Sequence, residues 1–202
     1  MTPALLLKDV VVSYGTSEVL HNCSLTIQRG QWAGLMGPNG SGKTTLLSAA
    51  VGRQTLQSGA ITVGGVDLAV SPRQAKANLG YAVDPNLIPG DLTGQQCLDI
   101  FALGRQLDAV DAGTLSLCEE LQLAGWLRQP VGKYSLGTRQ KLAVALAVLG
   151  EPGLLVLDEV FNGLDPISAQ ALKRWLQDRV TAGTCGVLMA THSLSLIESC
   201  CT

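Results

Sequence analysis

The chain has 202 residues, of which 47% are hydrophobic and 15% are charged, and its formal net charge is −2. This length fits one domain or one domain with a subdomain, and the hydrophobic content is ample for a core. The slightly negative charge gives no sign of general nucleic-acid binding. The N-terminal residues contain no basic segment followed by a long apolar region, so the sequence does not predict a signal peptide. We therefore expect a soluble protein of the cytosol.

Six cysteines are present, and none of them forms a C-x-x-C pair, so the sequence gives no indication of a zinc site. We expect them to serve as small apolar residues in a reducing compartment. They are Cys23, Cys97, Cys118, Cys185, Cys200 and Cys201.

The N-terminal part of the chain predicts strands. Leu5–Tyr14 is rich in residues that favour β-structure, and Leu20–Ile27 is a second candidate. Tyr14 falls near the end of the first strand, where its ring could stack on a flat base and bury apolar area on both faces. Packing in the core or at a sheet edge is the commoner role for such a tyrosine, so both interpretations stay open.

A phosphate-binding loop follows at Gly37–Thr44, which reads GPNGSGKT and matches the pattern G-x-x-x-x-G-K-[ST]. The apolar run Trp32–Met36 before it suits a short buried strand, and Thr45–Val51 after it suits a helix. Glycines let the backbone curl around an anion with its N–H groups pointing inward. Lys43 can then reach the β- and γ-phosphates, and the hydroxyl of Thr44 can bind Mg²⁺.

The middle of the chain changes character. Ser58–Gly65 is typical of a strand that ends in a hairpin turn, and Leu79–Val83 is another short strand, which breaks at Asp84–Asn86. From Thr93 to Gln129 the apolar residues recur at helical spacing. They include Leu98, Phe101, Ala102, Leu115, Cys118 and Leu121. We therefore expect a mainly helical subdomain inserted into an α/β core.

The last third predicts alternating helices and buried strands. Gly132–Gln140 opens a helix that runs to about Leu149 and is apolar nearly all round. Leu154–Leu157 suits a central parallel strand buried on both faces. A turn at Asn162–Pro166 leads into a helix that ends near Val180.

Two buried strands end in residues that carry chemistry. Asp158 and Glu159 follow Leu157, and His192 follows the strand Gly186–Thr191. Acidic residues at the carboxyl end of a parallel strand lie where α/β folds bind ligands. With a phosphate-binding loop upstream, Asp158 would hold Mg²⁺ through water and Glu159 would polarise the attacking water. Without that loop, the two acids would fit a helix N-terminus equally well.

Taken together, these motifs resemble an ATP-binding cassette, the nucleotide-binding subunit of an ABC transporter. The pieces fall in the family's order along nearly the whole chain. Tyr14 matches the adenine-stacking aromatic, Gly37–Thr44 Walker A, Asp84 the Q-loop position, Tyr134–Thr138 the signature loop, Leu154–Glu159 Walker B, Gly163–Asp165 the D-loop, and His192 the switch histidine.

The resemblance implies a single ABC ATPase domain over residues 1–202, of the α/β class. Residues 1–83 and 150–202 would form a P-loop NTPase (RecA-like) core with an N-terminal antiparallel β subdomain. Residues 84–149 would form the inserted α-helical subdomain with the signature loop.

The resemblance also implies ATP and Mg²⁺ as cofactors and a head-to-tail dimer of two cassettes, identical or different. ATP would contact Tyr14, Gly37, Pro38, Asn39, Gly40, Ser41, Gly42, Lys43, Thr44 and Thr45 of one cassette and Ser135 and Gly137 of the other. The metal would lie at Thr44, Asp84 and Asp158, and the catalytic residues would be Glu159, His192 and Lys43. An anion at Ser135 and Gly137 would face the start of a helix, which favours negative charge.

Two departures from the family pattern stand out. Asp84 replaces the usual glutamine, which adds charge beside a triphosphate and shortens the reach. Leu136 and Thr138 differ from the common L-S-G-G-Q pattern, in a way that resembles the exporter branch with separate membrane subunits.

The function implied is an ATPase that drives export through a separate transmembrane permease subunit, from the cytoplasmic face of the membrane, with no nucleic acid bound. Two alternatives stay open. One is a soluble ABC ATPase that takes no part in transport. The other is a weakly hydrolysing partner in an asymmetric pair, which Asp84 favours and the full set of catalytic residues opposes.

Overall fold

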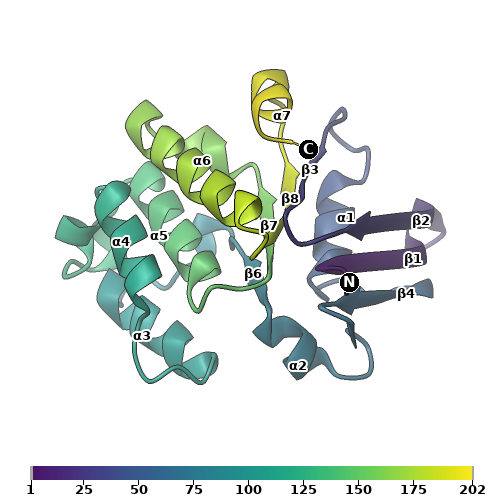
Figure 1. Cartoon of the computed structure of the whole chain (residues 1–202), viewed down its shortest axis with the longest axis horizontal. Helices are drawn as coiled ribbons and strands as arrows, with labels where there is room; N and C mark the ends of the chain where they lie inside the picture. Colours follow the sequence, from purple (N-terminus) through teal and green to yellow (C-terminus); the bar gives the residue numbers. More distant parts are fainter. Residues whose placement is uncertain (1, 202) are drawn as a thin grey trace. The chain divides into compact units, whose positions relative to one another are not determined.

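A computed structural model describes residues 2–201 (Figure 1). The chain divides into two compact units. The first unit contains the described residues up to Leu79, the segment Gly153–Glu159, and the described residues from Arg179 onward. The second unit contains Gly80–Pro152 and Val160–Asp178.

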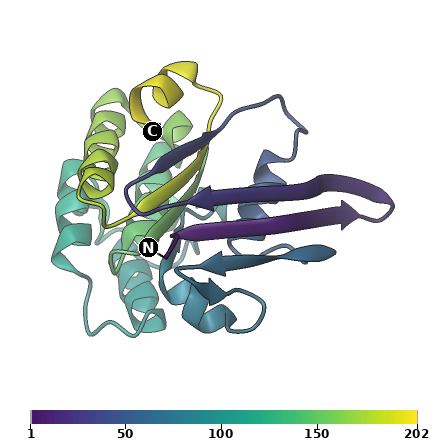
Figure 2. The same cartoon turned by 45° about the vertical axis from the view of Figure 1, so that its right-hand side comes forward.

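The first unit contains an antiparallel sheet with the strand order β2-β1-β4-β5. Its strands are β1 (Leu5–Tyr14), β2 (Ser17–Ile27), β4 (Ser58–Val63) and β5 (Val66–Asp67). Figure 2 shows the long hairpin of β1 and β2. The buried Leu5 lies opposite Ile27 and Val63, which are also buried. The predicted turn after β4 falls at Gly64 and Gly65, whose φ angles of 56° and 81° glycine adopts without strain.

The other sheet has the order β3-β8-β7-β6. Its strands are β3 (Trp32–Leu35), β8 (Gly186–Ala190), β7 (Leu154–Asp158) and β6 (Leu79–Tyr81). β8 pairs in parallel with both β3 and β7 and is buried along its whole length. Because these strands are parallel, the residues that follow β3, β7 and β8 emerge at the same edge of the sheet.

Three helices complete the first unit: α1 (Lys43–Ala50), α2 (Pro72–Ala77) and α7 (Leu194–Cys200). α1 packs against β7 and β8, and its Leu47 and Ala50 are fully buried. α7 packs so closely on β3 that a side chain at Gly34 would collide with Ile197. The glycine therefore permits the close approach of helix and strand.

The second unit is helical. It contains η1 (Pro85–Leu87), α3 (Gly94–Gly104), α4 (Ala112–Glu120), η2 (Ala124–Trp126), η3 (Val131–Lys133), α5 (Leu136–Val148), η4 (Val160–Gly163) and most of α6 (Pro166–Thr181). α5 is its centre, since α3 and α4 both pack on it and every residue from Leu142 to Leu149 is buried. Thr93 begins α3 with a capping box completed by Gln96.

The predicted strands and helices are found, with shifted ends. The helix expected to open within Gly132–Gln140 begins only at Leu136, because Ser135 caps it and Val131–Lys133 forms a separate 3₁₀ turn. The helical spacing over Thr93–Gln129 predicts more buried residues than the structure has. Phe101 is 39% exposed and Leu115 is 43% exposed, so helical periodicity places both residues on helices without burying them.

The six cysteines are free thiols, and four of them are buried. Burial raises the pKa of Cys118 and of Cys185 to about 12, which suppresses the reactive thiolate. Over residues 2–201, every helix falls short of the length and apolar character that crossing a bilayer requires.

Candidate nucleotide-binding site

The loop between β3 and α1 has the backbone of an anion cradle. Gly40 and Gly42 have φ angles of 81° and 89°, in the left-handed region that favours glycine. The amide of Ser41 donates to the carbonyl of Pro38 at 3.3 Å, which closes the turn. Gly42 is the N-cap residue of α1, so the loop ends where the helix presents its unpaired N–H groups.

The Lys43 ammonium lies within this loop. Its Nζ donates to the carbonyl of Gly37 at 2.7 Å and to the carbonyl of Pro38 at 3.0 Å. The loop itself thus holds the charge in place. A phosphate bound there would exchange these two neutral acceptors for charged ones, which make stronger hydrogen bonds with an ammonium group.

Thr44 and Asp158 meet at the carboxyl end of β7. The hydroxyl of Thr44 forms a hydrogen bond with the carboxylate. Burial raises the pKa of Asp158 above its usual value and Glu159 adds to the rise, while the Thr44 hydrogen bond and Lys43 oppose it. A cation bound beside this carboxylate would stabilise its charged form. A hydroxyl and a carboxylate are hard oxygen donors, so the pair fits Mg²⁺ with phosphate and water as its remaining ligands.

Residues 2–201 hold no cluster of three or more histidine, cysteine, aspartate or glutamate side chains suited to a metal ion. A dedicated protein cage of that kind is therefore missing from the described chain. Mg²⁺ at nucleotide sites usually keeps waters and substrate phosphates as ligands, and for that arrangement Thr44 and Asp158 suffice.

Glu159 has a strained backbone. Its φ is 51°, unusual for a residue with a side chain, and its amide donates to the carbonyl of Ala190 in β8 at 3.1 Å. Its Oε1 lies 3.1 Å from Nε2 of His192. The strand pairing of β7 and β8 thus brings a carboxylate and an imidazole together at the edge where the phosphate loop also emerges. Sequence order alone gave no sign of this contact.

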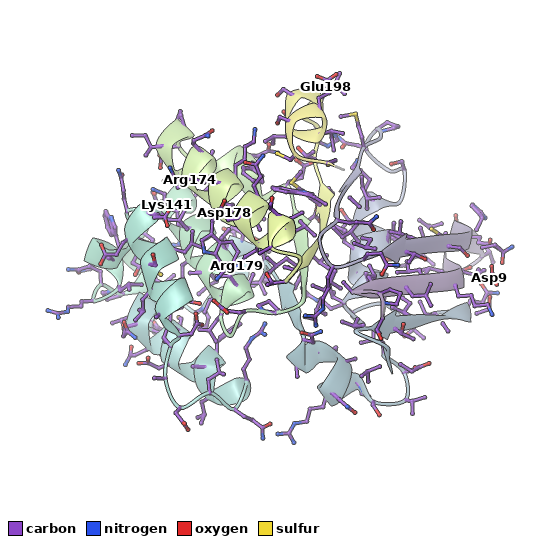
Figure 3. All side chains as sticks on the ribbon, in the orientation of Figure 1. Asp9, Lys141, Arg174, Asp178, Arg179 and Glu198 are labelled. Atoms are coloured by element: carbon purple, nitrogen blue, oxygen red, sulfur yellow. The ribbon has the colours of Figure 1, made fainter. Side chains whose placement is uncertain are left out.

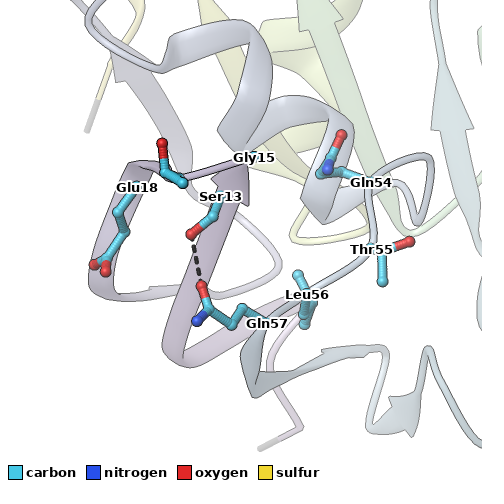
Figure 4. Close-up of a pocket in the computed structure, with 8 residues that line it drawn as sticks. Ser13, Gly15, Glu18, Gln54, Thr55, Leu56 and Gln57 are labelled. Carbon is cyan, nitrogen blue, oxygen red and sulfur yellow. Dashed lines mark hydrogen bonds between the residues drawn. The ribbon is translucent and has the colours of Figure 1, made fainter.

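Tyr14 is 53% exposed, and its hydroxyl donates to Oε1 of Gln54 at 3.0 Å. Beside it lies a pocket of about 590 Å³ (Figure 4). Its lining is Ser13, Gly15, Thr16, Glu18, Gln54, Thr55, Leu56 and Gln57. Ser13 donates to Gln57 across it at 2.6 Å. The ring of Tyr14 is therefore accessible and held at its hydroxyl, as a stacking platform requires. Gln54 carries no motif that would have identified it from the sequence.

The second unit holds the predicted signature loop, Tyr134–Thr138. Oγ of Ser135 accepts from the amide of Thr138 at 3.1 Å and lies 2.8 Å from the Thr138 hydroxyl, so Ser135 is the N-cap residue of α5. A Cβ at Gly137 would lie only 2.7 Å from the carbonyl oxygen of Gly163. The signature loop and the D-loop, Gly163–Asp165, therefore touch through their backbones.

The carboxylate of Asp84 forms hydrogen bonds within its own turn. Its Oδ1 accepts from the amide of Asn86 at 2.9 Å and from Nδ2 of Asn86 at 3.0 Å, and so caps η1. An aspartate is short enough to make this turn with its own chain. Its predicted role in metal binding stays a prediction.

The predicted site residues fall into two groups. Tyr14, the loop Gly37–Gly42, Lys43, Thr44, Thr45, Asp158, Glu159 and His192 belong to the first unit, and Asp84, Ser135 and Gly137 belong to the second. The first group combines a glycine loop, a lysine, a hydroxyl–carboxylate pair and a carboxylate–histidine pair on a parallel sheet. These features define a P-loop nucleotide-binding protein.

Comparisons with known proteins give the family. Residues 20–162 match the family model described as ABC transporter, and the chain therefore belongs to the ABC transporter ATP-binding family. An uncharacterized ABC transporter ATP-binding protein of Bacillus subtilis, YdbJ, is 34% identical over 98% of this chain and 64% of its own length. The chain thus spans slightly less than two thirds of that relative.

Solved structures agree on the fold. A structure described as the ATP binding subunit of an ABC transporter is 30% identical, with a TM-score of 0.90 over 98% of this chain and 83% of that one. The cassette MJ0796, solved as a dimer in a post-hydrolysis state with ADP and Pi, is 21% identical, with a TM-score of 0.84 over 95% of this chain and 89% of that one. The predicted fold class, an α/β P-loop core with an antiparallel sheet and a helical part, is confirmed.

Proposed function

We propose that this chain binds and hydrolyses ATP and thereby drives export across a membrane through a separate transmembrane subunit. The observation that carries the proposal is the arrangement at one sheet edge. Lys43 is held in the glycine loop, Thr44 contacts Asp158, and Glu159 contacts His192. Each contact supplies one part of a nucleotide-hydrolysis site.

Binding would follow from the loop geometry. The triphosphate would occupy the loop, with Lys43 between the β- and γ-phosphates and the amides of the loop and of α1 turned toward the phosphate oxygens. Asp158 and Thr44 would hold Mg²⁺, which neutralises charge on the phosphates. The ring of Tyr14 would stack on the adenine, with its hydroxyl kept in place by Gln54.

Hydrolysis would use Glu159 as the general base. A water oxygen attacks the γ-phosphorus, its proton passes to the Glu159 carboxylate, and the bond from the γ-phosphorus to the bridging oxygen breaks to leave ADP. Lys43 stabilises the charge that develops on the leaving oxygens. His192, whose Nε2 lies 3.1 Å from Oε1 of Glu159, would orient this carboxylate and contact the γ-phosphate.

We further propose that two cassettes form the complete site head to tail. Ser135 and Gly137 lie at the start of α5, where the unpaired amides of a helix favour an anion. They would contact the γ-phosphate of ATP held by the Lys43 of a second cassette. The dimeric state described for MJ0796 supports such an assembly.

Attachment to the cytoplasmic face of a membrane, through a permease subunit, rests on the family and on the names of the relatives. The alternative of a weakly hydrolysing partner in an asymmetric pair draws some support from Asp84, since its carboxylate is engaged with Asn86. The transported substrate would be set by the membrane subunit.

The deciding experiment measures phosphate release from ATP by the purified chain, with Lys43→Ala as the matched control. We expect Mg²⁺-dependent release that the variant lacks. Equal rates for the two proteins would refute the proposed ATPase site. Co-purification from detergent with a multi-span membrane protein would then test the transport role, and a chain that consistently purifies without one would favour the soluble alternative.

A further inference from the structure

An ion pair whose lysine is buried joins α5, the helix that Ser135 caps, to the D-loop. Nζ of Lys141 in α5 lies 2.7 Å from Oδ2 of Asp165, with side chains 11% and 43% exposed. Lys141 is the one buried charged residue within residues 2–201, and Figure 3 labels it on α5. Placing a lysine there requires loss of its hydration, so the position needs a reason beyond packing.

Asp165 also accepts hydrogen bonds from the first turn of α6. Its Oδ1 accepts from the amide of Ser168 at 2.9 Å, and its Oδ2 accepts from the Ser168 hydroxyl at 2.8 Å. The hydroxyl of Ser168 also reaches the carbonyl of Leu121 at 3.3 Å. Lys141 therefore pairs with a carboxylate that also caps the start of α6.

A second contact lies one turn of α5 earlier. A Cβ at Gly137 would come within 2.7 Å of the carbonyl oxygen of Gly163, and a Cβ at Gly163 would come within 3.3 Å of Cγ of Gln140. Gly137 and Lys141 are four residues apart and so lie on the same face of the helix. The D-loop is thus attached to that face at two points, one through backbone contact and one through charge.

We propose that Lys141 is a positioning residue for ATP hydrolysis: by holding Asp165 it fixes the D-loop against the first turns of α5, so that Ser135, Gly137 and the D-loop meet a second cassette as one rigid surface. This inference rests on the proposed function. An ion pair with one buried partner adds little to stability compared with an apolar side chain of similar size, but it fixes the position of the partner that it holds. Lys141 would accordingly affect turnover more than folding.

The informative substitution is Lys141→Met. Methionine keeps the length of the side chain and leaves no unpaired buried charge, while the partly exposed Asp165 can turn to water and still cap α6. Asp165→Asn would be a poorer test, because it would leave the Lys141 ammonium buried without its partner. Lys141→Arg keeps the charge and serves as the conservative variant.

Arg174→Met provides a matched control in the same unit. Nη2 of Arg174 lies 3.2 Å from Oε2 of Glu120, an ion pair that joins α6 to α4 at an exposed position and touches neither loop. Like Lys141→Met, the substitution Arg174→Met removes one positive charge from the helices of the second unit.

The experiment measures kcat and KM for ATP, and amide hydrogen exchange over Val160–Ser168, in wild type and the three variants. For Lys141→Met we expect kcat to fall about ten- to a hundredfold, the size of effect that a small misplacement produces, with little change in KM. Exchange in Val160–Ser168 should become faster. Arg174→Met should leave both measurements near wild type, and Lys141→Arg should restore most of the turnover.

Wild-type kcat and wild-type exchange in Lys141→Met would overturn the inference. An equal loss in Arg174→Met would also overturn it, because the effect would then be one of general stability, and so would a failure of Lys141→Arg to restore turnover. The proposed function fails separately, and the inference with it, if wild type and Lys43→Ala release phosphate at the same rate.

Discussion

Glu159→Gln is the substitution that separates ATP binding from hydrolysis most sharply. The amide is nearly the same size as the carboxylate, and the strained backbone at φ 51° is held by the bond from the Glu159 amide to Ala190, which does not involve the side chain. The glutamine side chain can keep the position that puts Oε1 3.1 Å from Nε2 of His192 in the wild type. We therefore expect the variant to fold and to bind ATP.

Turnover is a different matter, because an amide cannot take the proton of the attacking water. Loss of a general base lowers the rate by about 10²- to 10⁴-fold. That range corresponds to roughly 3–5 kcal/mol of transition-state stabilisation, at 1.36 kcal/mol for each factor of ten. The free energy of unfolding should change far less, because no backbone hydrogen bond is lost.

The assay is phosphate release under saturating ATP and Mg²⁺. Glu151→Gln is a suitable control, because Glu151 also has φ 51° and stands just before the strand that leads to Glu159. It removes the same charge from the same kind of backbone. A Glu159→Gln protein that hydrolyses ATP as fast as Glu151→Gln would refute the general-base role.

Trapped ATP should also hold two cassettes together. With ATP and Mg²⁺, Glu159→Gln should elute as a dimer in size-exclusion chromatography at high protein concentration. Adding Ser135→Arg should return it to a monomer, because the bulk would enter the shared site. A dimer that forms without nucleotide, or that survives Ser135→Arg, would contradict the head-to-tail arrangement.

Three further predictions follow from the first unit and the Q-loop position. Lys43→Ala should abolish tight ATP binding, because the triphosphate loses the cation held at the Gly37 and Pro38 carbonyls; unchanged affinity in a nucleotide titration would show that the loop does not bind phosphate. Asp84→Gln should fold normally and alter the Mg²⁺ dependence of turnover, since it frees the position from its turn with Asn86, and superimposable Mg²⁺ titrations would show the departure to be neutral. Asp158→Asn should raise the melting temperature of the nucleotide-free protein at pH 7. Burial raises the pKa of Asp158 in the folded protein, so the stability that the protonated carboxyl contributes is fully present below the unfolded pKa and is lost as pH rises through the folded pKa. The difference in melting temperature between Asp158→Asn and wild type should therefore shrink as pH falls toward 4. A difference in melting temperature that stays constant with pH would count against this account.

The sequence by itself determined the local elements of the site. The glycine spacing of Gly37–Thr44 requires a loop with left-handed residues, and the structure has them at Gly40 and Gly42. The aliphatic run before Asp158 required a buried parallel strand, and β7 is one. These features follow from backbone preferences and hydrophobic pattern over a few residues, which the sequence states directly.

The tertiary structure alone decided the contacts between residues that are distant in sequence. Glu159 meets His192 because β7 and β8 are neighbours in the sheet, and Lys141 meets Asp165 because η4, which ends two residues before Asp165, packs on α5. It also showed that Asp84 caps its own turn and that Phe101 and Leu115 are partly exposed. Such outcomes depend on which surfaces the whole chain buries together, and periodicity along one segment carries no information about its distant partners.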